Sequence, residues 1–365
     1  MLAVGAICAI LAIKLQQKQL TIHNNVNSVP RRRHSTSDEM RYILYGVGEQ
    51  FSPYDPQLID YVHSHISQPS FTRPRQLAKP QTDASQVGQS MLVDKLLSGR
   101  RGGFFIECGA TDGEVYSNSL FFELERNWTG LLIEANPNYH RTLLDKNRRA
   151  FVLRSCLNTE LRPATVRMQP AGVLGGIVDK MHQSHIAFIG AAKKPVVTVN
   201  CFPLNTITAA LGISHVDYLS LDVEGPEIEI LRTVDWTRLH IDVITVEYRI
   251  CGGAKNRIDL PATLKKLTDL RQFFRDTGIY REVSLLPNGS DANGLDIVFA
   301  HSWTWGTIFN EITWLVTPLW TRVNTGQRWT STLKFILLFV GSLCKFYNMM
   351  TDNWASCLVL RMLSG

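Results

Sequence analysis

Short apolar runs alternate with helical patterns in the middle of the chain. Residues 104–106, 129–134 and 151–153 read as buried strands, because apolar residues follow one another with few polar breaks. Between them, residues 120–124 carry apolar side chains at helical spacing, and residues 139–147 read as a short helix. The order predicts a β-α-β-α-β unit, which implies a parallel sheet with right-handed crossovers.

The same alternation continues further along the chain. Residues 216–222 and 241–248 read as two more buried strands, and residues 295–300 as a last strand. Residues 260–276 place Leu264, Leu267, Leu270 and Phe274 on one stripe of an amphipathic helix. We expect that stripe to pack against the core rather than to hold a ligand.

One long segment has little pattern. Residues 170–195 contain four glycines but no clear periodicity, and we expect a flexible insertion beside the ligand edge that could act as a lid. His182 and His185 lie three apart there, and without an acid or cysteine to complete a metal spacing we interpret them as exposed loop histidines.

The first strand ends in an unusual turn. Glu107 is followed by Gly109, Asp112 and Gly113, and a polar run then leads into the next helix. Glycines let the backbone turn sharply and approach a ligand. The spacing differs from the G-x-G-x-x-G of dinucleotide sites, and its acids would repel a phosphate but attract the ammonium or sulfonium region of S-adenosylmethionine. A glycine turn that binds nothing fits this segment alone equally well.

Acids also end the later strands. Glu134 ends the second strand, ahead of the strand-breaking Asn136, and its carboxylate could accept both hydrogen bonds from a ribose diol. Asp222, Glu224 and Glu247 end the two later strands. Any one of these acids is better interpreted as a solvated strand end, but together they predict a ligand site at the carboxyl edge of the sheet.

Three segments carry a family resemblance. The stretches FFIECGATDGEVYSNSLFFELERNWTGLLIEANP, VDYLSLDVEGPEIEILRTVDW and ITVEY resemble the FkbM-type methyltransferase domain, and most closely its animal Star-like branch. The resemblance covers residues 92–300. It implies an α/β, Rossmann-like class I methyltransferase fold, with a mostly parallel seven-stranded sheet and helices on both faces. It also implies S-adenosylmethionine as the cofactor.

The resemblance assigns roles to individual residues. Those implied to bind the cofactor are Glu107, Gly109, Asp112, Gly113, Glu134 and Asn136, and those implied at the methyl-transfer site are Asp222 and Glu224. An oxygen nucleophile must lose a proton, and Asp222 is the first choice of base because it ends its strand. The alternative is a non-catalytic trafficking factor that assists transport of ligand precursors of the epidermal growth factor receptor between endoplasmic reticulum, Golgi and endosome.

The chain divides into four parts by composition. Residues 1–13 are apolar and suit a truncated signal anchor, residues 14–89 a poorly ordered stem, and residues 90–300 the domain. Residues 301–365 are rich in tryptophan and read either as a membrane-interface hairpin or as a wrongly appended translation. Lysines and arginines after the apolar segment would place the domain in the cytosol, whereas the resemblance implies a lumenal domain on a secretory-pathway membrane. The partner would be an unknown methyl acceptor or a secretory cargo protein.

Composition argues against nucleic-acid-binding and metal-binding functions. The 365 residues are 45% apolar with a formal charge of +6, and no basic-aromatic stripe accompanies the three arginines at 31–33, so we expect no nucleic-acid partner. None of the seven cysteines forms a C-x-x-C pair, and we expect no metal site. Cys156 and Cys201 could form a lumenal disulfide or remain two buried thiols. Asn127 and Asn288 begin glycosylation triplets.

Overall fold

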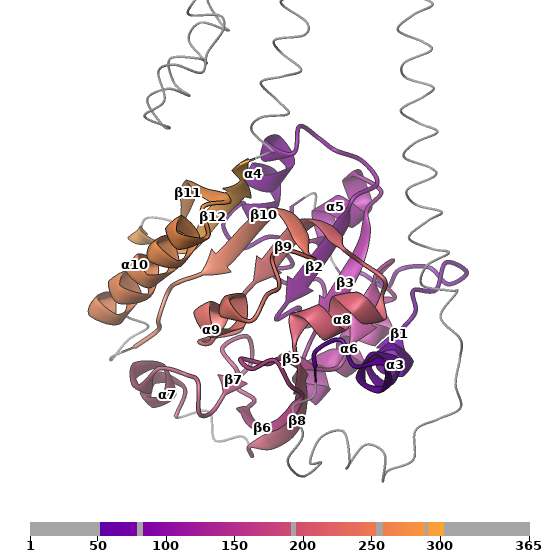
Figure 1. Cartoon of the computed structure of the whole chain (residues 1–365), viewed down its shortest axis with the longest axis horizontal. Helices are drawn as coiled ribbons and strands as arrows, with labels where there is room; N and C mark the ends of the chain where they lie inside the picture. The colour runs from indigo at the N-terminus through magenta and orange to yellow at the C-terminus, as the bar shows by residue number, and fades with distance from the viewer. Residues whose placement is uncertain (1–51, 79–82, 191–194, 253–257, 289–290, 303–365) are drawn as a thin grey trace, which may run out of the picture. The chain divides into compact units, whose positions relative to one another are not determined.

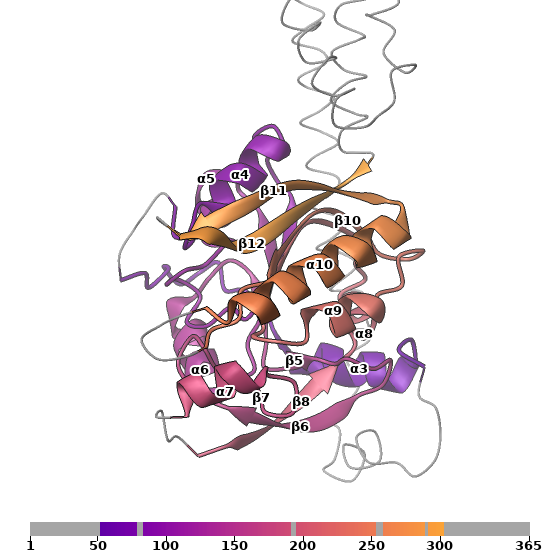
Figure 2. The same cartoon turned by 90° about the vertical axis from the view of Figure 1, so that its left-hand side faces the viewer.

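The architecture comes from a computed structural model, shown in Figures 1 and 2, that describes residues 52–78, 83–190, 195–252, 258–288 and 291–302. The expected apolar anchor at 1–13 and nearly all of the tryptophan-rich segment at 301–365 lie outside the described residues. No helix in the described part of the chain is long and apolar enough to cross a bilayer.

A large mixed sheet forms the centre of the domain. Its strand order is β1-β4-β3-β2-β9-β10-β12-β11. The strands are β1 (Ile66–Ser67), β2 (Phe104–Cys108), β3 (Thr129–Ile133), β4 (Phe151–Leu153), β9 (His215–Leu221), β10 (His240–Glu247), β11 (Tyr280–Asn288) and β12 (Asp291–His301). The five strands from β4 to β10 are parallel, whereas β1, β12 and β11 pair antiparallel. The α/β fold is therefore as expected, but the sheet has eight strands rather than seven, because β1 adds to its edge.

Helices cover both faces of this sheet (Figure 2). Their bounds are α3 (Pro56–His65), α4 (Gln89–Leu96), α5 (Leu120–Glu125), α6 (Pro137–Lys146), α8 (Leu204–Ala210), α9 (Glu227–Arg232) and α10 (Leu260–Thr277). One continuous apolar core joins α3, α8, α9 and α10 to one face of the sheet. On the other face, the ring of Phe122 in α5 lies 5.5 Å from that of Tyr218 in β9. Because the helices bury both faces, the sheet can interact with a ligand only along its strand ends.

Local sequence explains where the longest helix begins and ends. The Asp259 side chain accepts a hydrogen bond from the backbone of Ala262 and so caps the start of α10. Gly278 ends the helix in a left-handed conformation, with φ of 68°. Leu267, Leu270 and Phe274 are buried in the core. The expected amphipathic helix is therefore confirmed, although Leu264 of the proposed stripe is exposed.

A second, four-stranded sheet occupies the segment after the third parallel strand. Its order is β5-β8-β6-β7, formed by β5 (Cys156–Leu157), β6 (Ala164–Gln169), β7 (Gly176–Ile177) and β8 (Val197–Phe202). Cys156 and Cys201 are register partners in β5 and β8 and form a disulfide. The expected unpatterned insertion at 170–195 is wrong for its described part, because this part contains β7 and the helix α7 (Gln183–Ile189).

Part of the expected stem is folded. Leu58, Tyr61 and Val62 of α3 are buried in the main core, and α3 packs against α8. Asp55 caps this helix, and Pro56 fits its first turn. Residues 56–65 therefore form a helix packed in the main core rather than part of a poorly ordered stem.

Candidate functional site

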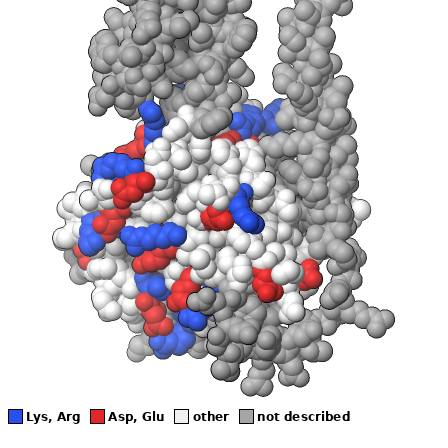
Figure 3. Space-filling model, viewed as in Figure 1, with Lys and Arg blue, Asp and Glu red and all other residues white. Residues whose placement is uncertain are grey.

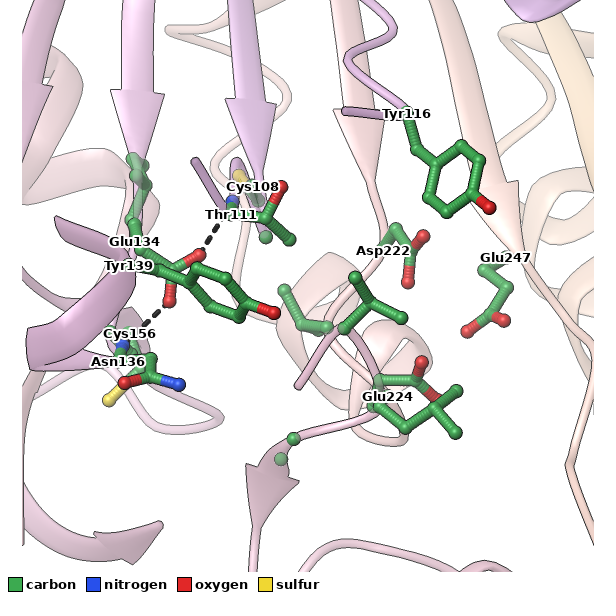
Figure 4. Close-up of a pocket in the computed structure, with 18 of the residues that line it drawn as sticks. Cys108, Thr111, Tyr116, Glu134, Asn136, Tyr139, Cys156, Asp222, Glu224 and Glu247 are labelled. Carbon is green, nitrogen blue, oxygen red and sulfur yellow. Dashed lines mark hydrogen bonds between the residues drawn. The ribbon is translucent and has the colours of Figure 1, made fainter. Parts of the chain in front are cut away.

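The carboxyl ends of β2, β3, β9 and β10 border a cavity of about 310 Å³ (Figure 4). Residues of the second sheet and of the turn at 172–177 line it as well. Five acids from four strand ends line this one cavity: Glu107, Glu134, Asp222, Glu224 and Glu247. The convergence of these acids at one edge of the sheet, expected from the sequence, is confirmed.

The turn after β2 comes close to the end of β9. Gly109 has φ of 80°, and a Cβ there would lie 1.9 Å from the carbonyl oxygen of Asp222. Only glycine fits this position, both for its conformation and for its space. Gly109 lines the cavity, whereas Gly113 does not; a Cβ on Gly113 would meet the Leu143 side chain at 2.3 Å.

Asp112 shapes the turn rather than the cavity wall. Its carboxylate accepts hydrogen bonds from the backbone N–H groups of Glu114 and Val115, both at 2.9 Å. Asp112 is not among the residues that line the cavity. Cofactor binding by Asp112 and Gly113 stays a prediction, and the structure gives both residues a local structural role.

Glu107 is buried and well supplied with donors. Its carboxylate accepts hydrogen bonds from the Ser117 hydroxyl at 2.9 Å, the Asn118 backbone at 2.6 Å and the Ser119 hydroxyl. Burial raises the pKa of Glu107, and the nearby Arg148 together with these hydrogen bonds opposes that rise. Glu107 therefore holds the loop before α5 against the end of β2, while it also lines the cavity.

Glu134 reaches the cavity from the end of β3. One carboxylate oxygen accepts from the backbone of Thr111 at 2.7 Å, and the other from the backbone of Asn136 at 2.6 Å. Burial raises the pKa of Glu134 to about 7, and the backbone hydrogen bonds oppose the shift. Asn136 also lines the cavity and caps α6 through a hydrogen bond from the backbone of Asn138. Each oxygen of Glu134 keeps acceptor capacity for a ligand hydroxyl.

The other side of the cavity contains an acidic cluster, by which we mean Asp222, Glu224 and Glu247 (Figure 4). One carboxylate oxygen from each of these acids lies within 4.8 Å of those from the other two. Burial, together with Asp296 and Glu227 nearby, raises the pKa of Asp222 to about 7. The pKa values of Glu224 and Glu247 are raised well above normal, again by burial first and then by neighbouring acids.

Two buried residues support the loop that carries Glu224. Glu227 is fully buried and accepts hydrogen bonds from the backbone of Val223 at 3.2 Å and of Gly225 at 3.1 Å. Lys266 of α10 forms an ion pair with Glu227 at 2.6 Å. The ammonium group of Lys266 therefore sits close behind the acidic cluster and partly offsets its charge.

Left-handed backbone is concentrated around the cavity. Thr111, Tyr116 and Glu224 line it and have φ values of 47°, 60° and 61°. Residues other than glycine adopt this conformation at a cost of about 1–2 kcal/mol, and such strain tends to gather at functional sites. These three positions therefore support the cavity as a candidate functional site.

Sequence analysis missed several residues of this wall. Tyr139 of α6 and Tyr116 of the loop before α5 point into the cavity (Figure 4), and Arg249 lines it just beyond β10. Tyr139 was assigned only as a helix start, and the two tyrosines carry no motif of their own. The signal that could have found Arg249 is its place two residues after Glu247.

The interpretation of His185 as an exposed loop histidine is wrong. His185 is 3% exposed, its Nδ1 lies 3.3 Å from a carboxylate oxygen of Glu224, and its Nε2 lies 3.0 Å from the Leu174 carbonyl. Burial lowers the pKa of His185. His182, by contrast, caps α7 through its Nδ1 and is largely exposed. The difference arises because His182 is the N-cap, outside the helix, whereas His185 lies within α7 on the buried side that it shares with Ile189.

Charged side chains on the face shown in Figure 3 alternate in sign over the described residues. Lysine and arginine stand next to aspartate and glutamate rather than in one block. Ion pairs between neighbouring opposite charges, such as Lys265–Asp269 and Arg271–Glu282, occur in the described part of the chain.

Several solved structures that are similar to this chain are methyltransferases, and their sequence identity to it is low. The FkbM methyltransferase of Methylobacillus flagellatus KT is 15% identical, with 55% of this chain and 44% of that chain covered and a TM-score of 0.32. The precorrin-6y C5,15-methyltransferase of Geobacter metallireducens GS-15 is 16% identical, with coverage of 58% and 87% and a TM-score of 0.29. A putative rRNA methylase of Clostridium thermocellum is 9% identical, with coverage of 60% and 100% and a TM-score of 0.32. No curated protein matches the chain.

A family model gives the more specific match. Residues 107–278 match the methyltransferase FkbM domain. The match begins at Glu107, runs through both strand-end motifs and ends at Gly278, the residue that ends α10. It thus contains all five acids of the cavity. Residues 107–278 of this chain are therefore similar to the methyltransferase FkbM domain.

Proposed function

We propose that this domain transfers a methyl group from S-adenosylmethionine to an oxygen acceptor. The observation that carries the proposal is the single cavity that brings the glycine turn after β2 together with the acids that end β3, β9 and β10. Its volume of about 310 Å³ is within the usual range for small-molecule sites. The family model supports the methyltransferase reaction class.

The residues present fit such a cofactor. Gly109 lets the end of β2 come close to the backbone of Asp222, so that both strand ends border one cavity, and Glu134 offers carboxylate oxygens to a ribose diol. When bound, S-adenosylmethionine supplies a methyl group on a positively charged sulfur. Glu107 and Asn136 line the same part of the cavity and hold the two loops that surround it.

The acidic cluster faces the remaining part of the cavity. We assign it to the acceptor side, because Glu134 and the acidic cluster lie apart across the cavity (Figure 4). An oxygen acceptor must lose a proton, and Asp222 and Glu224 are placed to accept that proton as general bases. Holding the reacting groups in line would supply much of the rate enhancement.

The test is cofactor binding by calorimetry with the full chain. We expect S-adenosylmethionine to bind one site, and Glu134→Ala to abolish the heat of binding. Glu160→Ala is the matched control, since Glu160 is an exposed acid outside the cavity. A folded protein that binds no cofactor would overturn the proposal. Release of S-adenosylhomocysteine with candidate acceptors then tests turnover.

For the cell, we propose a membrane-tethered protein of the secretory pathway with a lumenal domain, as in the Star-like branch. The Cys156–Cys201 disulfide supports an oxidising compartment, because disulfides are rare in cytosolic proteins. Protease protection of the domain in sealed microsomes is the expected result. A domain that binds no cofactor but retains a secreted cargo protein would instead favour the trafficking function.

A further inference from the structure

The acidic cluster has a geometry that one ion can span. The three carboxylate oxygens, one each from Asp222, Glu224 and Glu247, lie within 4.8 Å of one another. Two oxygens bound to one ion lie at most about 4.2 Å apart for Mg²⁺, which binds oxygen at roughly 2.0–2.1 Å, and about 5.2 Å apart for the larger Ca²⁺. One cation can therefore contact all three side chains, and an ion as small as Mg²⁺ would draw the three oxygens slightly closer together.

One oxygen in the cluster lacks a partner. Oε2 of Glu247 has no hydrogen-bond partner among the described residues, although Glu247 is only 5% exposed. Glu247 lines the cavity, and its carboxylate points toward Asp222 and Glu224 (Figure 4). A buried carboxylate oxygen without a donor is unfavourable, and a bound cation would satisfy it.

The surroundings add more acid than base. Asp296 is the register partner of Glu247 on β12, is 3% exposed, and its Oδ1 also has no hydrogen-bond partner within the described part of the chain. Lys266 is already paired with Glu227 at 2.6 Å, and Arg249 also lines the cavity. Asp296 and Glu227 thus place two more buried acids beside the acidic cluster, and the Lys266 ammonium is already used by one of them.

We propose that Asp222, Glu224 and Glu247 bind one divalent cation of the Mg²⁺ and Mn²⁺ class at the acceptor side of the cavity. The proposal rests on the proposed function and deepens it, and it replaces the sequence expectation that the chain has no metal site. All three ligands are carboxylates, which favour hard cations over zinc or copper. The acceptor would then be a molecule whose oxygen completes the coordination shell. The cation would lower the pKa of that oxygen, so its proton could leave to water, and Asp222 and Glu224 would act as ligands rather than as bases.

A second group of metal-type side chains in the described structure provides a control. Nε2 of His215 and of His240 lie 3.0 and 2.8 Å from the same oxygen of Asp242, while Arg100 pairs with the other oxygen. This group is at the amino-terminal ends of β9 and β10. Its carboxylate is already satisfied by these neighbours, so we assign no cation to it.

Manganese binding to the full chain tests the proposal. The protein is stripped with EDTA and titrated with Mn²⁺ by electron paramagnetic resonance, without S-adenosylmethionine. We expect one Mn²⁺ per chain, displaced by excess Mg²⁺. Asp222→Asn and Glu247→Gln keep the shape of each side chain, and we expect each to weaken Mn²⁺ binding at least tenfold. His240→Ala and Glu160→Gln should leave it unchanged.

Other outcomes are decisive as well. The cation site would be overturned if the folded wild-type protein bound no Mn²⁺. It would also be overturned if Asp222→Asn and Glu247→Gln bound Mn²⁺ as tightly as the wild type does. Loss of binding in His240→Ala alone would move the ion to the other group and overturn the proposal too. If a variant does not fold, the wild-type melting temperature decides, because Mg²⁺ must raise it if the site exists. Calorimetry with S-adenosylmethionine on the same sample tests the proposed function separately.

Discussion

The backbone carbonyl of Asp222 occupies the space that a side chain at Gly109 would need. A Cβ on Gly109 would lie 1.9 Å from that oxygen, and the amide of Asp222 in turn donates a hydrogen bond to the carbonyl of Cys108 at 3.3 Å. The two motifs of the cavity, 113 residues apart in sequence, are thus held together by backbone contacts. Both contacts require that position 109 has no side chain.

Gly109→Ala is therefore expected to destabilise the domain strongly. The methyl group would collide with backbone, which cannot rotate away, and φ of 80° adds strain. We expect a loss of about 3 kcal/mol or more in the free energy of unfolding, measured by urea denaturation. Gly278→Ala is the matched control: its φ is 68° but nothing lies within 4 Å of its Cβ, so only the strain of about 1 kcal/mol remains. Equal losses in both variants would contradict the collision.

Glu134 predicts a pH dependence of cofactor binding. Its pKa is raised to about 7, and only the ionised carboxylate accepts two hydrogen bonds from a ribose diol. Affinity for S-adenosylmethionine should therefore be about tenfold weaker at pH 6 than at pH 8. Calorimetry at the two pH values measures the difference. Glu134→Gln should bind more weakly at pH 8 and lose this dependence, whereas an unchanged tenfold difference in Glu134→Gln would assign it to another group.

The same group has the opposite effect on stability. Because the folded state raises the pKa of Glu134 above its ordinary value near 4.5, the folded protein holds this proton more tightly than the unfolded chain does. The contribution of Glu134 to stability is present below about pH 4.5 and is lost as the pH rises through about 7. Glu134→Gln, compared with Glu160→Gln, should flatten this part of the stability profile in urea denaturation. An identical slope in both variants would contradict the assignment.

A buried ion pair outside the cavity predicts a large effect of one arginine. Arg100 pairs with Asp217 and Asp242, and Asp217 is fully buried and also accepts from the backbone of Phe104 at 2.7 Å. Arg100→Leu would leave the Asp217 carboxylate buried without this cation. Since the Arg100 side chain is 35% exposed, we expect about 2 kcal/mol rather than the larger values of fully buried pairs.

The neighbouring arginine serves as its control. Arg101 is exposed, and among the described residues it donates a hydrogen bond to the carbonyl of Glu125. Arg101→Leu should change the free energy of unfolding by less than about 0.5 kcal/mol. Thermal or urea unfolding of Arg100→Leu and Arg101→Leu measures the difference between them. Similar losses in the free energy of unfolding would mean that the buried Asp217 does not need Arg100.

The sequence predicted the parts of the site that follow from regular geometry. Parallel strands end at the same edge, so acids that follow Leu221 and Val246 had to meet once those runs were recognised as strands. The main helices followed in the same way, because α10 combines a polar cap at Asp259 with an apolar stripe. Periodicity and caps are local signals, and a single sequence contains them.

The second sheet shows what local signals lack. In β6 only Met168 is buried, and β5 and β7 are two residues long, so no strand pattern of normal length exists there. These strands are fixed by their partners and by the Cys156–Cys201 bond. The burial of His185 against Glu224 is likewise a tertiary contact across 39 positions, which no pattern around His185 reports.

The disulfide should hold the wall of the cavity in place. Cys156 lines the cavity, and the chain between the two cysteines, separated by 45 positions, contains β6, β7 and α7. Closing a loop of this length stabilises a protein by about 4 kcal/mol through the entropy of the unfolded chain. We expect Cys201→Ser, or reduction of the wild type, to lower the melting temperature and to weaken cofactor binding. Cys251→Ser is the control for the melting temperature alone, since Cys251 is a free thiol that also lines the cavity. Thiol labelling in denaturant should find two more reactive thiols after reduction; an equal number before and after would show that the bond is absent.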